Sequence, residues 1–412
     1  MKKTLAAVAV LGAFAGSALA ADVQLYGIVD TGVGYNHVDV DSLDGIDIPN
    51  EAGDAYAYSF ADSDSFSMMS GQASGSRWGL KGTEDLGNGL TVGFILEDGF
   101  TSDNGADSAP MFNRESSLFV QGGFGKFAMG RMGSLNNGQS SWAKVGMVSA
   151  FGTSDWGGYS AQLSNIFSLA GQWDNMVAYE TPSFAGFKVY AQYAMGSNDN
   201  ENESSSDRYY AIGATYNNGP FAGYFAVDSI NYQTSGAKID DKYIDDSLTV
   251  TLGGSWNFEV AKVYFGAQYF DEVKLSSIGG ITKTTVSDVN LSKIGDLPDI
   301  TVGALVKVKG YGISLTADAP VAGGKAMFGV GYVDAEAADS IQDALKDANA
   351  DADLDLKRYV VSVGYDYPFS KRTDVYAIAS YMQDQVDTKL SGTSYDWDPS
   401  AYTLYVGLRH RF

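Results

Sequence analysis

Residues that could carry out covalent or metal chemistry are scarce in this sequence. Its 412 residues include no cysteine and only two histidines, which excludes disulfides, thiolate zinc sites and cysteine nucleophiles. His37 lies near Asp39, and a His–Asp pair is a component of hydrolytic sites. A lone pair of this kind in an acid-rich segment is more typical of surface chemistry, and no convergent nucleophile–base pair accompanies it. We therefore predict that the protein is not an enzyme and has no cofactor.

The acidic residues near the C-terminal third invite a calcium interpretation. Asp351, Asp353 and Asp355 would share one face of an extended loop. An EF-hand also needs glycine at loop position six and glutamate at position twelve, and neither is present. A solvated acidic loop is therefore favoured, and we expect no metal site. Within the same stretch, Ile341 and Leu345 have the spacing of one face of a short helix.

The overall charge constrains the partners. Lysine and arginine number 27 against 50 aspartates and glutamates, so the formal net charge is −23. Such a surface repels phosphates, and nucleic acid is therefore not expected as a partner. The 49 glycines and 26 tyrosines, with no cysteine, favour a large β protein.

The first twenty residues have the pattern of a signal peptide. Lys2 and Lys3 precede an apolar stretch at residues 5–14, and Ala18-Leu19-Ala20 supplies the small residues of a cleavage site. The apolar stretch is too short to span a bilayer as a helix. We predict that residues 1–20 are removed and that an exported protein begins at Ala21.

The mature sequence alternates between apolar and small or polar residues. Leu248, Val250 and Leu252 alternate with Thr249 and Thr251, and similar runs recur up to the C-terminus. Side chains of a strand point alternately to its two faces, so this period predicts strands with one apolar face. Two architectures remain open: a soluble β-sandwich whose apolar face is a core, or a transmembrane barrel whose apolar face meets lipid.

The connections favour the barrel. Seven short turns alternate with eight long loops, which predicts an all-β fold, a 16-stranded antiparallel transmembrane β-barrel over residues 21–412. Aromatic residues near the strand ends fit interfacial girdles, and closure leaves no unpaired strand edge in lipid. The short turns are predicted at residues 84–89, 122–125, 182–186, 217–220, 257–260, 319–324 and 369–372. The long loops are predicted around residues 38–74, 101–110, 132–173, 197–207, 233–246, 272–299, 334–356 and 384–400.

These residues resemble a known family, the general porins of Gram-negative bacteria, in particular the β-proteobacterial and neisserial type. The similarity covers essentially the whole mature chain, and its most specific parts are the Lys81–Gly89 turn and the terminal His410-Arg411-Phe412. Other segments that match are Val23–Asp30, Ser76–Leu90, Phe112-Asn113-Arg114, Gly130-Arg131, Tyr179–Phe187, Gly364–Tyr367 and Ser370–Thr373. The resemblance implies a homotrimer of sixteen-stranded barrels in the outer membrane, in which the third loop folds inward as a constriction.

The third long loop, at about residues 132–173, is the candidate constriction. Lys144 and Asp155 are its only charged residues, and it is rich in aromatic residues. The aromatic residues could provide stacking surfaces for sugars or rings, but packing of the loop against the barrel wall is favoured. Asp155 is accordingly a candidate pore-lining residue.

The candidate residues on the wall are mostly basic. Arg77 and Lys81 have inward parity, because Trp78 and Leu80 take the lipid face. The resemblance assigns Arg77 to the arginine ladder of the family. It assigns Arg114 to the same ladder and Arg131 more loosely, because the parity of Arg131 is outward unless a bulge intervenes. Glu180 has inward parity, and Ala178 stands where relatives often have a basic residue.

These features predict an outer-membrane porin, a water-filled channel for passive diffusion of ions and small hydrophilic solutes. The alternative is a channel selective for sugars or aromatic or organic acids, followed by an outer-membrane hydrolase or adhesin. The expected partners are two further copies of the chain, outer-membrane lipid with lipopolysaccharide, and the barrel-assembly machinery. Phe412 is predicted to be an assembly signal, because the last strand must close against the first.

The net charge also bears on ion selectivity. Removal of Lys2 and Lys3 changes the net charge from −23 to −25. Acidic loops around residues 38–64 and 334–355 should concentrate cations at the mouth of a channel. We therefore expect K⁺ to pass more readily than Cl⁻, with Arg77 and Arg114 opposing this bias locally.

Overall fold

The computed structural model describes most of the predicted barrel. The described residues are 22–39, 47–49, 55–57, 62–108, 110–196, 206–232, 238–239, 242–243, 245–275, 307–347, 353–390 and 393–412. The predicted signal peptide, residues 1–20, and Asp351 lie outside them.

Strands are the main secondary structure of the described chain. The strands of the main sheet are β1 (Asp22–Asp39), β4 (Ser63–Ser70), β5 (Arg77–Gly87), β6 (Leu90–Gly99), β7 (Glu115–Gly122), β8 (Gly125–Gly133), β9 (Gln172–Glu180), β10 (Phe187–Ala194), β11 (Arg208–Asn218), β12 (Phe221–Asn231), β15 (Leu248–Asn257), β16 (Lys262–Lys274), β17 (Lys307–Val321), β18 (Gly324–Ala337), β19 (Asp353–Pro368), β20 (Thr373–Leu390), β21 (Thr393–Trp397) and β22 (Ser400–Arg411). The small elements are β2 (Asp47–Pro49), β3 (Ala55–Ala57), β13 (Lys238–Ile239), β14 (Lys242–Tyr243), the 3₁₀ turns η1 (Val145–Val148) and η2 (Leu163–Asn165), and the helix α3 (Asp339–Asp347).

The main sheet closes on itself as a barrel. β1 pairs antiparallel with β22 on one side, and on the other side with β4 along its second half and β5 along its first half. β4 and β5 are therefore two parts of one wall strand, and β21 and β22, which both pair with β20, are two parts of another. The eighteen strands of the sheet thus form a wall of sixteen, and the predicted strand number is confirmed.

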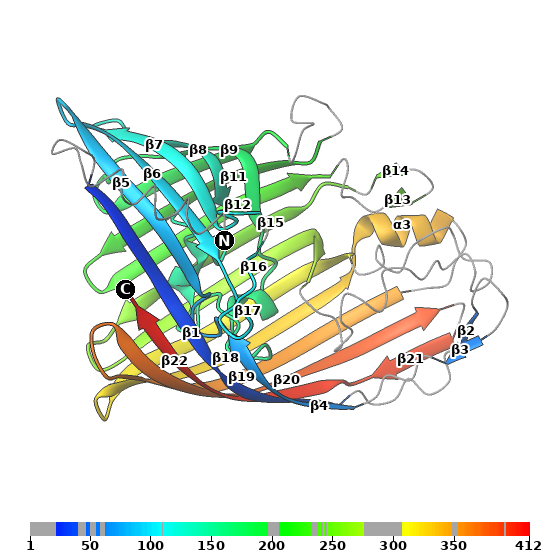
Figure 1. Cartoon of the computed structure of the whole chain (residues 1–412). Helices are drawn as coiled ribbons and strands as arrows, with labels where there is room; N and C mark the ends of the chain where they lie inside the picture. Colours follow the sequence, from blue (N-terminus) through cyan, green and yellow to red (C-terminus); the bar gives the residue numbers. More distant parts are fainter. Residues whose placement is uncertain are drawn as a thin grey trace.

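The turns and loops separate to the two ends of the barrel. All seven predicted short turns join neighbouring strands of the wall. Figure 1 shows these turns at the end where β22 finishes, and shows α3 with the β2–β3 and β13–β14 hairpins at the other end. In the orientation of an outer-membrane barrel, the short turns are periplasmic and the long loops are extracellular. α3 confirms the helix predicted around Ile341, whose side chain is fully buried.

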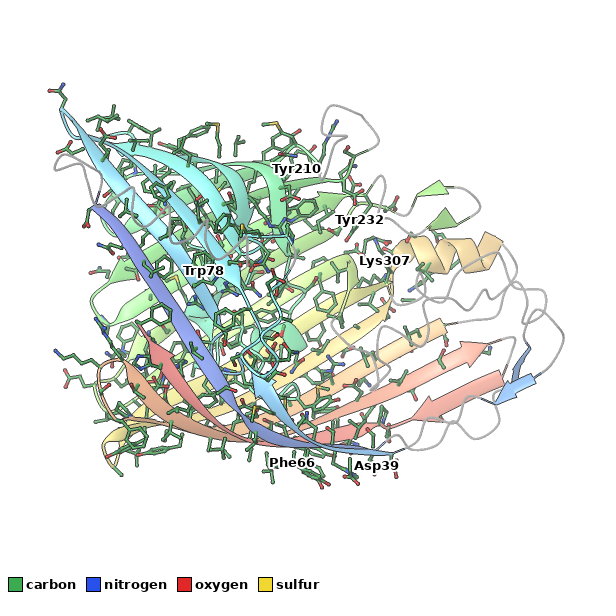
Figure 2. All side chains as sticks on the ribbon, in the orientation of Figure 1. Asp39, Phe66, Trp78, Tyr210, Tyr232 and Lys307 are labelled. Atoms are coloured by element: carbon green, nitrogen blue, oxygen red, sulfur yellow. The ribbon has the colours of Figure 1, made fainter. Side chains whose placement is uncertain are left out.

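Period-two alternation distinguishes the two faces of the wall as predicted. In β15, Leu248 and Leu252 are exposed on the outer surface, whereas Thr249 and Thr251 are buried on the inner surface. Large apolar side chains such as Phe66 and Tyr210 project from the outside of the barrel (Figure 2). The outer surface is therefore apolar enough to face lipid. No helix in the described part of the chain is long and apolar enough to cross a membrane.

Candidate functional site

The loop between β8 and β9, which we name the constriction loop (residues 134–171), folds into the barrel. Its apolar side chains are buried against the inner wall, and they include four of the five aromatic residues of the loop. These buried residues are Leu135, Trp142, Val145, Val148, Phe151, Trp156, Ala161, Leu163, Ile166 and Phe167. The packing interpretation of the loop aromatics is therefore the one that the structure supports.

Inward-facing glycines of the wall make room for the loop. A Cβ atom at Gly312 would lie 2.0 Å from the carbonyl oxygen of Ile166, and one at Gly331 would lie 2.3 Å from its Cδ1. Similarly, a Cβ at Gly253 would lie 2.7 Å from Val148. Much of the inner face of the wall, where the small residues lie, is therefore covered by the loop and does not line open lumen.

Polar side chains of the wall hold the loop backbone at several points. Gln192 accepts a hydrogen bond from the Leu135 amide at 2.9 Å and donates to the Gly133 carbonyl. Other wall side chains contact the loop from the opposite strands, where Thr316 accepts from Ala150, Ser362 from Ala161 and Gln268 from Ser168. Because buried backbone groups need partners, these bonds fix the path of the loop across the barrel.

A buried ion pair holds the far end of the loop. The Arg358 guanidinium on β19 donates two hydrogen bonds, of 2.7 and 2.8 Å, to the Asp384 carboxylate on β20. Its Nη1 also donates to the Asn165 carbonyl of η2 at 3.1 Å. The side chains of Arg358 and Asp384 are 0% and 2% exposed.

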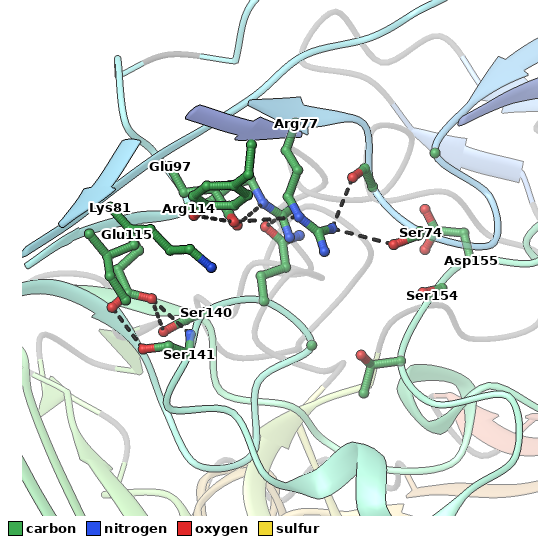
Figure 3. Close-up of a pocket in the computed structure, with 17 residues that line it drawn as sticks. Ser74, Arg77, Lys81, Glu97, Arg114, Glu115, Ser140, Ser141, Ser154 and Asp155 are labelled. Carbon is green, nitrogen blue, oxygen red and sulfur yellow. Dashed lines mark hydrogen bonds and ion pairs between the residues drawn. The ribbon is translucent and has the colours of Figure 1, made fainter. Parts of the chain in front are cut away.

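The loop and the β5–β7 wall enclose a cavity of about 410 Å³. Wall residues Arg77, Lys81 and Arg114 line it, and loop residues Ser154 and Asp155 line it from across the cavity (Figure 3). Four of the predicted site residues are therefore brought together. The remaining lining residues include Tyr26, Ile95, Glu97, Glu115, Gln139, Ser140 and Ser141.

The two arginines of the cavity share one carboxylate. Arg114 donates from Nε to Glu97 at 2.7 Å, and the Nε of Arg77 lies 3.4 Å from the same carboxylate. Tyr26 donates its hydroxyl hydrogen to Glu97 at 2.9 Å. Two guanidiniums against one carboxylate leave this part of the wall with a positive excess, at fixed positions.

Lys81 and Asp155 differ from the arginines because neither forms an ion pair with another described residue. Lys81 is exposed to the cavity and its ammonium lies 5.0 Å from the centroid of the Tyr26 ring. Asp155 is likewise exposed on the loop side. In the described residues, the cavity therefore presents one unpaired cation on the wall and one unpaired carboxylate on the loop.

Glu97 and Glu115 were missed by the sequence reasoning, although a signal for them existed. Each lies in or at the start of a predicted wall strand, where a charge must face the lumen because lipid does not tolerate it. Glu115 accepts hydrogen bonds from the Ser141 amide at 2.7 Å and from the hydroxyls of Ser117, Ser140 and Ser141. It therefore joins the loop to the wall, and its charge is well satisfied.

Arg131 and Glu180 lie away from this cavity. A register shift between Gly130 and Met132 marks a bulge at Arg131, whose Nη1 donates to Asp174 at 2.6 Å. Its cross-strand neighbour is Ser116, and Arg131 is not among the residues that line the cavity. Glu180 accepts a hydrogen bond from Lys188 at 2.5 Å near the periplasmic end.

Ala178 is buried on the inner wall beneath the constriction loop. Its side chain is 1% exposed, and it belongs to the apolar cluster beneath the loop. A basic side chain substituted at this position would displace the loop before it reached the lumen, so it is a poor site for testing the charge of the lumen.

Phe412 completes the closure of the barrel. Its amide donates to the Gly27 carbonyl at 3.0 Å, and the Gly27 amide donates to the Phe412 carbonyl at 3.1 Å. A Cβ at Gly27 would lie 2.4 Å from Cζ of the Phe412 ring. The ring of Phe412 therefore packs against Gly27, where any larger residue would clash with it.

His37, the histidine considered for a hydrolytic pair with Asp39, pairs with a different aspartate. The Nδ1 of His37 lies 2.9 Å from Asp64, on an exposed part of the wall. No group of three or more histidine, aspartate and glutamate side chains in the described chain has the geometry to hold a metal ion.

Comparisons with known proteins agree with this geometry. Residues 6–387 match the Gram-negative porin family. The chain is 32% identical over 426 residues to an outer membrane porin protein of Bordetella pertussis, and 27% identical over 422 residues to the major outer membrane protein P.IB of Neisseria gonorrhoeae, with all of each chain covered. A solved structure, the anion-selective porin from Comamonas acidovorans, aligns with a TM-score of 0.58 at 24% identity, covering 95% of this chain and 100% of that one. The last similarity shows a shared fold.

Proposed function

The chain belongs to the family of Gram-negative porins, and on this premise we propose that Arg77, Lys81, Arg114 and Asp155 form the constriction of its channel. The protein is an outer-membrane porin that allows passive diffusion of ions and small solutes. As a channel it makes and breaks no bonds. Its selectivity therefore depends on the width of the lumen and on the charges that line it.

The observation that carries the proposal is the cavity between the wall and the constriction loop. The wall contributes its cations and the loop contributes Asp155, so a solute that passes this level meets charges of both signs. A channel that is wide above and below would be narrowest here, because the loop occupies part of the cross-section. Arg131 is kept as a lumen candidate near the extracellular end, and Glu180 as one near the periplasmic end.

The buried aromatic residues weigh against a sugar-selective channel. Trp142, Phe151 and Phe167 are at most 2% exposed, so their faces are not available for stacking. A general diffusion channel requires no such surface.

We further propose that the barrel forms a homotrimer and meets lipid and lipopolysaccharide with its outer surface. The exposed apolar side chains of that surface support both contacts, since they need a neighbouring subunit or acyl chains to cover them. The Phe412–Gly27 closure supports recognition of the last strand by the barrel-assembly machinery. The serine hydroxyls that meet a carboxylate in the cavity, those of Ser140 and Ser141 on Glu115, join the constriction loop to the wall, so we assign them a structural role and not a hydrolytic one.

Planar-bilayer recordings of two matched variants test the constriction. Asp155→Asn should shift the reversal potential in a KCl gradient toward anions, and Lys81→Gln should shift it toward cations, because each removes one unpaired charge. Lys262→Gln, at the start of β16 and outside the cavity, is the control for Lys81→Gln. If the Asp155 and Lys81 variants shift the potential no more than the control does, the constriction lies elsewhere.

A further inference from the structure

A group of lysines lies on the inner wall, close to the periplasmic turns and outside the constriction cavity. Lys126 is the second residue of β8 and Lys188 the second residue of β10, and each of these strands follows a short turn. Lys126 pairs in register with Glu180 of β9, which in turn pairs with Tyr190 of β10. Tyr190 is buried on the inner side, so the side chains of this row point into the barrel.

Lys144 of the constriction loop lies next to this group. Its ammonium lies 5.4 Å from the centroid of the Tyr190 ring and donates to the Ser141 carbonyl at 2.9 Å. Burial, helped by the charges of Lys126 and Lys188 and opposed by those of Glu180 and Glu115, lowers the pKa of Lys144 to about 8. Lys126 contacts the ring of Trp142, two residues before Lys144, and its cross-strand partner Glu180 accepts a hydrogen bond from Lys188, so the three lysines lie around one part of the inner wall.

Two of these ammonium groups are held by aromatic rings instead of carboxylates. Lys126 lies 4.3 Å from the Phe119 ring centroid and 5.0 Å from that of Trp142. Within the described residues it makes no ion pair. Because a ring attracts a cation through its quadrupole and carries no net charge, these contacts fix the ammonium without neutralising it.

The carboxylates nearby are already in use. Glu180 is bonded to Lys188 at 2.5 Å. Glu115 receives its hydrogen bonds from serine hydroxyls and a backbone amide. Lys126 and Lys144 therefore keep an uncompensated positive charge next to the lumen.

We propose that Lys126 and Lys144, with Lys188 beside them, form a binding site for small oxyanions that carry two or more negative charges. Charge-assisted hydrogen bonds from several ammonium groups to one ligand favour such an ion over a monovalent one. The site lies on the periplasmic side of the constriction loop, so a solute would meet it after passing Arg77 and Arg114. This inference rests on the proposed channel function.

Sulfate is a suitable probe, because it keeps two charges throughout the pH range of the test. In planar bilayers with KCl, sulfate added at constant ionic strength should reduce the current through the wild-type channel. Lys126→Gln and Lys144→Gln should each weaken this block by about five- to tenfold. The matched control is Lys262→Gln, which removes a lysine that also lies over a ring, 4.7 Å from the Tyr264 centroid, at the same end of the barrel. It should leave the block unchanged.

A pH series on the unmodified protein gives a second readout. Since the pKa of Lys144 is lowered to about 8, sulfate block should weaken between about pH 7 and about pH 9, and Lys144→Gln should reduce that dependence. Equal block in the lysine variants and the control, or a pH-independent block in the wild type, overturns the inference. A protein that conducts KCl but ignores sulfate refutes only the anion site, whereas one that does not conduct KCl refutes the channel itself.

Discussion

Replacing Arg358 by methionine should destabilise the barrel strongly, because it removes the guanidinium that donates two hydrogen bonds to a buried carboxylate. Asp384 is 2% exposed and receives two hydrogen bonds from this guanidinium. Removing one member of a buried ion pair costs about 3–5 kcal/mol. The Asn165 carbonyl loses its bond as well, which adds about 1 kcal/mol.

The double variant Arg358→Met/Asp384→Leu separates the cost of breaking the ion pair from the cost of losing the hydrogen bond to the Asn165 carbonyl. It removes both charges, and an apolar pair of similar volume often replaces a buried ion pair without loss. We expect it to cost about 1 kcal/mol, the value of the lost bond to the constriction loop. The double variant should therefore be more stable than the single one.

Equilibrium urea unfolding in lipid vesicles, followed by tryptophan fluorescence, measures both free energies of unfolding. Single-channel current noise reports the loop in parallel, since either variant frees the backbone at Asn165 and should increase the noise. Equal destabilisation by the single and double variants would refute the argument that the cost comes from removing only one charge of the buried pair. Unchanged noise in both would refute the anchoring of the loop by Arg358.

Other changes test the outer face, the closure and the charge of the lumen. Val250→Arg places a charge on the lipid face and should cost about 2–4 kcal/mol, whereas Val250→Leu should fold normally; equal yields of folded barrel from both would mean that this face does not meet lipid. Deleting Phe412 and replacing Gly27 by valine should both reduce the amount of heat-resistant trimer in outer membranes, because each removes the contact of the last residue with β1. A normal trimer level in both variants would show that assembly does not depend on this contact. In a low-salt KCl gradient the acidic loops should favour K⁺, and replacing Lys126 and Lys144 by glutamine should strengthen this preference; a reversal potential of the Cl⁻ sign in the wild type would show that the lysines and arginines outweigh the loops.

The strand order and the faces of the barrel could be predicted because both follow from local patterns. The alternation of Leu248, Val250 and Leu252 with Thr249 and Thr251 has the period of a strand whatever the strand pairs with. The seven short turns fix antiparallel neighbours, and lipid requires closure. Sixteen strands then follow from counting.

The path of the constriction loop could not be predicted in the same way. The loop packs against wall residues from strands distant in the sequence, such as Gly312 and Ser362. The local alternation of residues does not indicate these contacts. Arg77, Lys81 and Arg114 were found through parity and resemblance. The sharing of Glu97 between the arginines depends on how β5, β6 and the residue before β7 meet at one level of the wall. The cluster around Lys144 was missed because its members are separated along the chain and come together only when the loop folds inward.

Chemical modification of the constriction loop tests the central claim most directly. The chain contains no native cysteine, so Ser154→Cys introduces a single thiol into the cavity wall. A bulky thiol reagent should lower the single-channel conductance in three equal steps, one for each subunit of a trimer. Ser370→Cys, in an exposed periplasmic turn, is the control and should leave conductance unchanged. Full modification at Ser154→Cys, verified by mass, with no fall in conductance would contradict the claim that the current passes between the constriction loop and the wall.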